Sequence, residues 1–271
     1  MTAMKLGQHF LIDKKKKKKF IDALDLKSDE TIIEIGPGHG EITKNLKSQI
    51  SNLKVFAIEK DRHLILELKK KFVTDKNIKI IEGDALKILP ELTKRLKNKS
   101  YKIFGNIPFY ITGYLFRVLG ELKNKPSLIV FFLQKEVAQR ICAIPPKMNL
   151  LAASIQFWAK PEITGYISKK DFWPMPKVDS AIIALTPIYA DNKQINAEKY
   201  YKLIKVLFKQ PRKTILNNLV EANKREFLRE RMQKEEIIEK LVKVGINPSD
   251  RPQNLTIEQI KKSMLLTRRR F

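Results

Sequence analysis

The chain of 271 residues, 43% hydrophobic and 31% charged, is long enough to bury a core, and its single cysteine, Cys142, excludes an internal disulfide framework and a Cys-rich zinc site. The longest apolar run, Leu128 to Leu133, is too short to cross a bilayer, and the first ten residues lack the apolar segment of a signal peptide, so we expect a soluble, cytoplasmic protein. With 54 basic against 29 acidic side chains, a net charge of +25, the chain favours a polyanionic partner, either a nucleic acid or an acidic membrane surface.

Six consecutive lysines, Lys14 to Lys19, stand near the start of the chain, just before "FIDAL". A solvated helix face or a turn explains this run without any function. Contact with phosphate groups is the alternative. Most of the chain's basic excess is lysine, and Ile and Asn are frequent, which nucleotide bias in a genome can also produce. The charge alone therefore leaves the partner open.

Short apolar runs alternate with amphipathic segments between Thr31 and Gln134. Apolar residues at helical spacing separate the runs, and strand alternating with helix predicts a parallel sheet covered on both faces. Strands are expected at 31–35, 55–59, 78–83, 101–106 and 128–134, and helices at 41–50, 62–72, 90–97 and 114–122.

The pattern changes near Ile188, where a polar connector begins. Before it, we expect a helix at 134–141 and strands at 153–168 and 180–188, which would form an antiparallel edge. After it, helices are expected at 197–210, 212–232, 235–245 and 256–266. We therefore predict an α/β domain over residues 1–190 and a small all-α domain over residues 191–271.

Three glycines, Gly36, Gly38 and Gly40, follow the first long strand and open the next helix in "EIGPGHGEITKNL". Glycines at such a turn let the backbone approach a ligand closely. Glu59 ends the next strand, 23 residues after Gly36, where a nucleoside-binding fold places a carboxylate for ribose hydroxyls. Asp84 follows the third strand and can accept from the exocyclic amine of adenine. Together these residues predict a pocket for an adenosine-type cofactor.

The acidic surroundings of the glycine turn indicate which cofactor this is. A diphosphate favours G-x-G-x-x-G with the helix N-terminus free for anions. Here the spacing is G-x-G-x-G, Glu41 begins the helix and Glu34 precedes the turn. Acidic flanks suit a cationic ligand, and we expect S-adenosylmethionine (SAM) bound by a Rossmann-like methyltransferase domain.

The tetrad Asn106, Ile107, Pro108 and Phe109 ends the fourth strand, where a methyl acceptor would lie. The exocyclic amine of adenine is a poor nucleophile, because its lone pair is delocalised into the ring. The side-chain oxygen of Asn106 and a neighbouring carbonyl held by Pro108 would accept from that amine, and Phe109 would stack on the base. Positioning would then carry the rate without a titrating base.

These motifs identify a family resemblance that runs nearly end to end. "GQHFLID", "EIGPGHGEIT", "GNIPFYIT", "LQKEVAQRI" and "FWPMPKVDSAIIAL", followed by "FKQPRKTILNNL" and "GINPSDRPQNLTIEQI" in the tail, resemble the KsgA-type ribosomal RNA adenine dimethyltransferases. The resemblance implies SAM-dependent transfer of two methyl groups to N6 of each of two adjacent adenosines, in a hairpin near the 3′ end of 16S rRNA. It also implies the 30S subunit as partner, a role in subunit maturation, and a monomer.

The resemblance also implies site residues, which are carried over by motif. The catalytic loop would be Asn106, Ile107, Pro108 and Phe109, and the cofactor residues His9, Leu11, Gly36, Gly38, Glu59, Asp84 and Asn106, with no metal. The chain departs from the family pattern at two positions: His9 stands where Asn is more frequent, and Phe109 where Tyr is usual.

Further residues are weaker candidates. Phe172, Trp173, Pro174 and Pro176 would line the target-base side, although packing explains Trp173 equally well. His39 and His63 are expected to be local surface groups. Basic residues of the tail are candidate phosphate contacts, with a solvated helix as the default for each: Arg212, Lys213, Arg225, Arg229 and Arg231.

Three alternatives remain open. An Erm-type enzyme of 23S rRNA would use the same tetrad, although the "GINPSDRPQNLT" tail favours the small-subunit enzyme. A non-catalytic ribosome-assembly or RNA-binding factor would keep the fold, although the intact cofactor motifs argue against lost SAM binding. A DNA adenine methyltransferase would end its tetrad in Pro-Pro-aromatic, whereas this tetrad has a single proline.

Overall fold

The computed structural model describes residues 9–98, 100–188, 196–223 and 232–266, with only the backbone of Phe109 and Leu265. The chain forms two compact units. The first comprises Met1–Gln139 and Ala159–Pro187, and the second comprises Arg140–Trp158 and Ile188–Phe271. No helix within the described ranges is both long and apolar enough to span a membrane.

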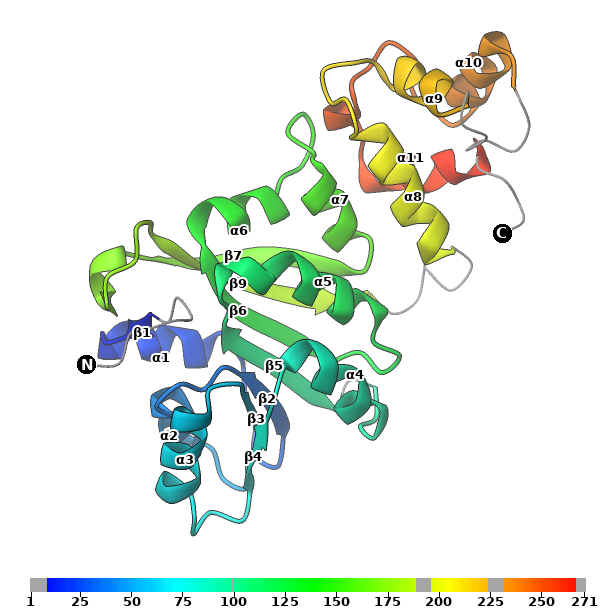
Figure 1. Cartoon of the computed structure of the whole chain (residues 1–271). Coiled ribbons are helices and arrows are strands. Elements are labelled where there is room, and N and C mark those ends of the chain that lie inside the picture. Colours follow the sequence, from blue (N-terminus) through cyan, green and yellow to red (C-terminus); the bar gives the residue numbers. More distant parts are fainter. Residues whose placement is uncertain (1–8, 99, 189–195, 224–231, 267–271) are drawn as a thin grey trace. The chain divides into compact units, whose positions relative to one another are not determined.

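The first unit is built on a seven-stranded sheet in the order β4-β3-β2-β5-β6-β9-β7 (Figure 1). The five strands from β2 to β6 are parallel neighbours, and β9 and β7 add an antiparallel edge, as the sequence predicts. The strands are β2 (Thr31–Ile35), β3 (Lys54–Glu59), β4 (Ile78–Glu82), β5 (Tyr101–Asn106), β6 (Leu128–Gln134), β7 (Ala159–Ile167) and β9 (Ser180–Pro187).

The order of the strands reverses beside β2. The chain passes from β2 outward through β3 to β4, then returns to pair β5 with the other edge of β2. In an open α/β sheet, such a reversal leaves a crevice at the carboxyl ends of the strands, where ligands bind. This topology places the glycine turn after β2 and the tetrad after β5 at the same crevice.

Two neighbouring phenylalanines of β6 show how helices cover both faces of the sheet. Successive residues of a strand point to opposite faces. Phe132 stacks on Phe20 of α1, with ring centroids 3.9 Å apart, whereas Phe131 meets Phe116 of α5 edge-on. The helices of this unit are α1 (Lys14–Asp22), α2 (Glu41–Gln49), α3 (Arg62–Lys71), α4 (Ala85–Lys94), α5 (Thr112–Glu121) and α6 (Lys135–Ile141), the last ending at the start of the second unit.

A second, two-stranded sheet joins the start of the chain to a segment more than 150 residues later. Strand β1 (Phe10–Leu11) pairs antiparallel with β8 (Phe172–Trp173), so that Phe10 faces Trp173. The 3₁₀ turn η2 (Lys169–Asp171) precedes β8, and Ile12 N donates to the Asp171 carbonyl at 2.8 Å. This antiparallel pairing holds the segment just before α1 beside η2, and it holds His9 beside the residues that follow β8.

The expected strand over residues 153–168 is wrong in its first third. Helix α7 (Leu150–Gln156) occupies that part, and β7 begins only at Ala159. Asn149 caps the helix because its side-chain oxygen accepts from Leu151 N and Ala152 N. Alternating apolar residues suggested a strand, but a strong N-cap and a buried helical face decided the local structure.

Helix α7 belongs to the second unit, together with the chain after Ile188. Phe157, just beyond α7, stacks on Tyr200 of α8 with ring centroids 4.0 Å apart, and the Tyr200 hydroxyl donates to the Ala153 carbonyl. The sequence boundary at residue 190 assigned this segment to the α/β domain. As a domain assignment it stays a prediction, while the compact units divide the chain also at Arg140 and Ala159.

In its described part, the remainder of the second unit consists of helices joined by turns and loops. Predicted helices correspond to α8 (Ala197–Leu207), α9 (Ile215–Asn223), α10 (Lys234–Lys243) and α11 (Ile257–Lys262), with 3₁₀ turns η3 (Pro252–Asn254) and η4 (Ser263–Leu266). Of the helix expected at 212–232, residues 212–214 lie in a turn before α9, and residues 224–231 lie outside the described residues, with Arg225, Arg229 and Arg231 among them.

Candidate active site

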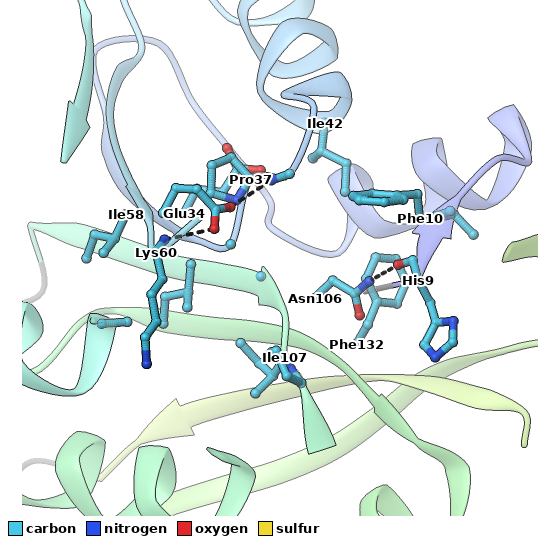
Figure 2. Close-up of a pocket in the computed structure, with 18 of the residues that line it drawn as sticks. His9, Phe10, Glu34, Pro37, Ile42, Ile58, Lys60, Asn106, Ile107 and Phe132 are labelled. Atoms are coloured by element: carbon cyan, nitrogen blue, oxygen red, sulfur yellow. Dashed lines mark hydrogen bonds between the residues drawn. The ribbon is translucent and has the colours of Figure 1, made fainter. Parts of the chain in front are cut away.

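A cavity of about 190 Å³ opens at the carboxyl ends of β2, β3, β4 and β5 (Figure 2). The first unit supplies every residue of its wall. Almost all of the predicted site residues meet here: His9, Leu11, Gly36, Gly38, Glu59, Asp84, Asn106, Ile107 and Pro108 line it. Only the 3₁₀ turn η1 (Phe109–Ile111) is described for Phe109, because its side chain lies outside the described part.

The glycine turn after β2 requires glycine at its inner positions. Gly36 and Gly38 have φ of 67° and 59°, in the left-handed region that favours glycine. A Cβ on Gly38 would lie 2.6 Å from the ring of Phe10, which therefore packs directly against the turn. The backbone of the glycine turn thus faces the cavity on one side and packs against the Phe10 ring on the other.

Glu59, at the end of β3, is held by main-chain donors. Its Oε1 accepts from the amides of Lys60 and Asp61 at 2.8 and 3.0 Å, and its Oε2 accepts from Gly38 N at 3.2 Å. A carboxylate offers about four acceptor sites. These bonds use three of them, and Oε2 keeps capacity for a hydroxyl in the cavity. Glu59 therefore links the glycine turn to β3 and still fits a ribose.

Glu34 is buried behind the same turn, with 2% of its surface exposed. Burial raises the pKa of the Glu34 carboxyl to about 8; a hydrogen bond from the Thr43 hydroxyl lowers it and the nearby Glu59 raises it. At neutral pH Glu34 is therefore mostly protonated. Glu34 was expected to be one of the acidic groups beside the glycine turn that favour a cationic ligand. Because burial removes most of its negative charge at neutral pH, Glu34 gives that expectation little support.

Asp84 caps α4 and stands at the cavity rim. Its Oδ1 accepts from Leu86 N at 3.0 Å, while Lys60 Nζ lies 3.3 Å from its Oδ2. Lys60 is a cavity residue that the sequence reasoning missed, although it directly follows Glu59. A carboxylate at the rim, apolar side chains such as Ile58 and Ala85, and exposed backbone at the glycine turn together fit the adenosine part of SAM.

The side chain of Asn106 has a fixed orientation. Its Nδ2 donates to the main-chain carbonyl of His9 at 2.6 Å. A carbonyl can only accept a hydrogen bond, so the amide nitrogen must face His9 and the amide oxygen must face away from it, as Figure 2 shows. The main-chain carbonyl of His9 therefore orients the Asn106 amide so that its oxygen can act as a hydrogen-bond acceptor.

The two backbone carbonyls of the tetrad differ in their bonding. The Pro108 carbonyl accepts from Ile111 N at 3.2 Å and from the Thr112 hydroxyl at 3.3 Å. Within the described ranges, no backbone or side-chain group donates to the carbonyl of Ile107, whose own N–H donates to the Phe132 carbonyl at 3.3 Å. The neighbouring carbonyl that Pro108 holds in place is therefore that of Ile107.

His9 lines the cavity, and its imidazole also has a partner in the chain. Its Nδ1 lies 2.8 Å from the Pro174 carbonyl, which requires a proton on Nδ1. The side chain ties the segment after β8 to the cavity, and the backbone carbonyl orients Asn106. Any contact of the His9 ring with the cofactor stays a prediction.

The outer rim carries exposed apolar side chains. Tyr110, Trp173 and Met175 are 65%, 62% and 59% exposed, whereas Phe172 is buried. Phe172 and Pro176 line the cavity, while their position on the target-base side stays a prediction. Among the other candidates, His39 bonds to Glu67 at 2.8 Å, His63 is exposed, and Arg212 and Lys213 are exposed surface groups.

Residues 2–262 match the family model described as "Ribosomal RNA adenine dimethylase". Proteins named "Ribosomal RNA small subunit methyltransferase A" are similar over most of their length. The one from Mycoplasma capricolum is 38% identical, covering 94% of both chains, and one from Dehalococcoides mccartyi is 36% identical, covering 96% of this chain and 86% of that one.

Solved structures share the fold. A dimethyladenosine transferase from Plasmodium falciparum superposes with a TM-score of 0.77 at 25% identity, covering 94% of this chain and 96% of that one. The 23S rRNA methyltransferase ErmE superposes with a TM-score of 0.67 at 21% identity, covering 95% and 99%. The second likeness shows the fold alone.

Proposed function

The chain belongs to the ribosomal RNA adenine dimethylase family, and on that premise we propose that it dimethylates N6 of two adjacent adenosines in the hairpin near the 3′ end of 16S rRNA. It is a SAM-dependent rRNA adenine methyltransferase. Its partner would be the small ribosomal subunit in the cytoplasm, where it would act as a monomer with a role in subunit maturation. The similarity to small-subunit methyltransferases from two organisms supports this choice over 23S rRNA.

The observation that carries the proposal is the bond from Asn106 Nδ2 to the His9 carbonyl. It leaves the amide oxygen of Asn106 as a fixed acceptor, beside the Ile107 carbonyl. Two acceptors aimed at one amine favour the pyramidal nitrogen, whose lone pair is then available for attack. Hydrogen bonds that strengthen as charge develops on the nitrogen lower the barrier.

SAM would supply an electrophilic methyl group on its sulfonium. Of the chain's own residues, Glu59 would accept from the ribose, Asp84 would accept from the adenine amine of the cofactor, and the backbone at Gly36 and Gly38 would allow close approach. His9 and Leu11 would complete this wall. Phe109 would stack on the target base, which contributes roughly 1–3 kcal/mol per base.

As the carbon–nitrogen bond forms, the bond from the methyl carbon to sulfur would break and the thioether S-adenosylhomocysteine would leave. The methylated nitrogen would then be cationic and acidic enough to release its proton to water, so the site needs no strong base. Asn106 has no charge to lose at ordinary pH. The mechanism therefore depends on placement of the amine rather than on its prior deprotonation.

The test is methylation of purified 30S subunits that lack the modification, with SAM as donor and mass mapping of the 16S rRNA. We expect two dimethylated adenosines in the 3′-end hairpin and no product with free 23S rRNA. Methylation of 23S rRNA alone would replace the proposal by the Erm-type activity. Tight 30S binding without methylation would favour the assembly factor.

A further inference from the structure

Helix α1 carries a dense cluster of positive charge, the six consecutive lysines Lys14 to Lys19. Asp13 caps it by accepting from Lys16 N at 2.8 Å, and Phe20 and Ile21 bury its end. Of the ammonium groups of Lys14 to Lys19, only that of Lys18 has a carboxylate within 4 Å in the described part of the chain, the 2.9 Å pair with Asp22. Like charges four residues apart destabilise a helix. An external anion would relieve this repulsion.

Two lysines of α1 can be placed relative to the cavity and the sheet. Lys17 lines the cavity itself. A Cβ on Gly165 of β7 would lie 2.6 Å from Lys19 Cε, so the aliphatic part of Lys19 lies over that strand. The lysines of α1 therefore contact the cavity at Lys17, while Lys19 lies over β7 of the same unit.

The segment at β8 carries an exposed aromatic ring on the strand that pairs with β1, which directly precedes α1. Trp173 pairs with Phe10, four residues before Lys14, and is 62% exposed. The bonds from Ile12 N to Asp171 and from His9 to Pro174 fix the segment on both sides of Trp173. Three further lysines lie in or beside this segment, Lys169, Lys170 and Lys177.

We propose that α1 and residues 169–177 form a surface, the α1–β8 surface, that binds the RNA strand continuing from the target adenosine. Lysines of α1 contact successive phosphates, and Trp173 stacks on an unpaired base. This rests on the proposed function and assigns the part of the chain that holds the substrate. A basic track with an interleaved aromatic ring is the usual means of binding single-stranded nucleic acid.

RNA fits this surface better than an acidic membrane does. One lysine of α1, Lys17, lines the cavity that a flipped adenine must enter, so an RNA strand leaving that adenine would pass close to α1. A membrane-bound helix needs an apolar face, whereas the buried residues of α1, Phe20 and Ile21, are used inside the protein.

The first experiment removes three charges from α1 with Lys14→Gln, Lys15→Gln and Lys18→Gln combined. Binding to a synthetic RNA of the 3′-end hairpin with its single-stranded flank is measured by fluorescence anisotropy across salt concentrations. Each phosphate contact on a single strand contributes about 0.7 to the logarithmic salt slope. We expect the slope to fall by about 2 and the affinity to fall on the order of 10- to 100-fold.

The matched control changes the same net charge on the same unit, at the exposed Lys69, Lys70 and Lys76. An equal loss of RNA affinity in both triple variants would show that only the net charge matters and would overturn the proposal. SAM affinity and the turnover rate at saturating 30S are measured in parallel and should stay unchanged. If wild-type protein methylates 30S and the α1 variant keeps its KM for 30S, the α1–β8 surface is refuted while the proposed function stands.

Trp173 offers a direct second readout. The chain has two tryptophans, and Trp158 is buried in the second unit, so Trp158→Phe leaves Trp173 as the only indole. Hairpin RNA should quench its fluorescence and protect it from acrylamide, and Trp173→Ala should weaken binding roughly 5- to 100-fold. Unchanged fluorescence on saturation with RNA would exclude stacking. Binding to phosphatidylglycerol vesicles that depends on the α1 lysines, with RNA affinity unaffected, would assign the surface to a membrane.

Discussion

The cavity has two halves that differ in how far folding completes them: a cofactor half around the glycine turn and Glu59, and an acceptor half around Asn106. On the cofactor half, Glu34 and Glu59 are buried and main-chain amides hold Glu59 in place. On the acceptor half, Asn106 is fixed, but Tyr110 of the cavity wall is mostly exposed, as are Trp173 and Met175 in the segment that supplies Phe172 and Pro176 to the wall. The cofactor half is thus completed by folding, whereas the acceptor half presents surface that a substrate would cover. The difference predicts that substitutions in the first half affect stability and that those in the second affect turnover and RNA binding.

Asn106→Ala should have the largest effect and should act on catalysis. Removing one group that stabilises developing charge costs about 10²- to 10³-fold in turnover. We expect a loss of that size in single-turnover methylation of 30S, with unfolding by urea little changed. Unaltered methylation would exclude the positioning mechanism, and a collapse of stability would erase the contrast between the two halves.

Glu34→Gln should change how stability depends on pH. The folded-state pKa of about 8 is raised above the ordinary 4.5, so the folded state holds a proton that the unfolded state releases. Stability is therefore full below about pH 4.5 and falls as pH rises through 8, by an amount on the order of a few kcal/mol. Glutamine mimics the protonated acid, and the variant should lose this decline in melting temperature between pH 5 and 8.

Glu41→Gln is the matched control for that measurement. A hydrogen bond from Lys71 lowers the pKa of Glu41, which contributes stability above its ordinary pKa of 4.5 that is lost on acidification. Its effect should thus be nearly constant from pH 5 to 8. The same pH slope in wild type and in Glu34→Gln would show that Glu34 is not the buried acid responsible.

Gly105→Ala should destabilise the sheet at the boundary between the halves. A Cβ there would lie 2.4 Å from the Ile35 carbonyl of the neighbouring strand, and such overpacking costs about 1–3 kcal/mol or more. Gly113→Ala is the control, since nothing lies within 4 Å of its Cβ position in α5 and alanine favours the helix. Urea unfolding should therefore shift in opposite directions, and equal shifts would contradict the packing argument.

His9→Ala should have the smallest effect. It removes the bond to Pro174, worth about 1 kcal/mol, and keeps the backbone carbonyl that orients Asn106. We expect turnover to stay within a few-fold of wild type, with a modest rise in KM for 30S as the β8 segment loosens. A large fall in SAM affinity, measured by calorimetry, would instead show that the imidazole contacts the cofactor.

The sequence alone was sufficient to predict the parallel part of the sheet and the gathering of the site residues at one edge of it. Four features lie at the carboxyl ends of four separate strands: the glycine turn, Glu59, Asp84 and the tetrad. Parallel strands bring these ends to one edge of the sheet. That inference needs only local periodicity and strand order. For the same reason it failed at residues 153–156, where the apolar spacing suits a strand and a helix equally and the Asn149 cap decides.

The tertiary structure alone decided the properties that depend on distant neighbours. The proton on Glu34 follows from burial beneath α2, the direction of the Asn106 amide from a carbonyl 97 residues earlier, and the union of α7 with α8 from ring stacking. The position of Trp173 beside Phe10, four residues before the first lysine of α1, follows from the β1–β8 pairing. A sequence pattern records which residues can bury or bond, but desolvation and hydrogen-bond partners are fixed only when remote segments pack together.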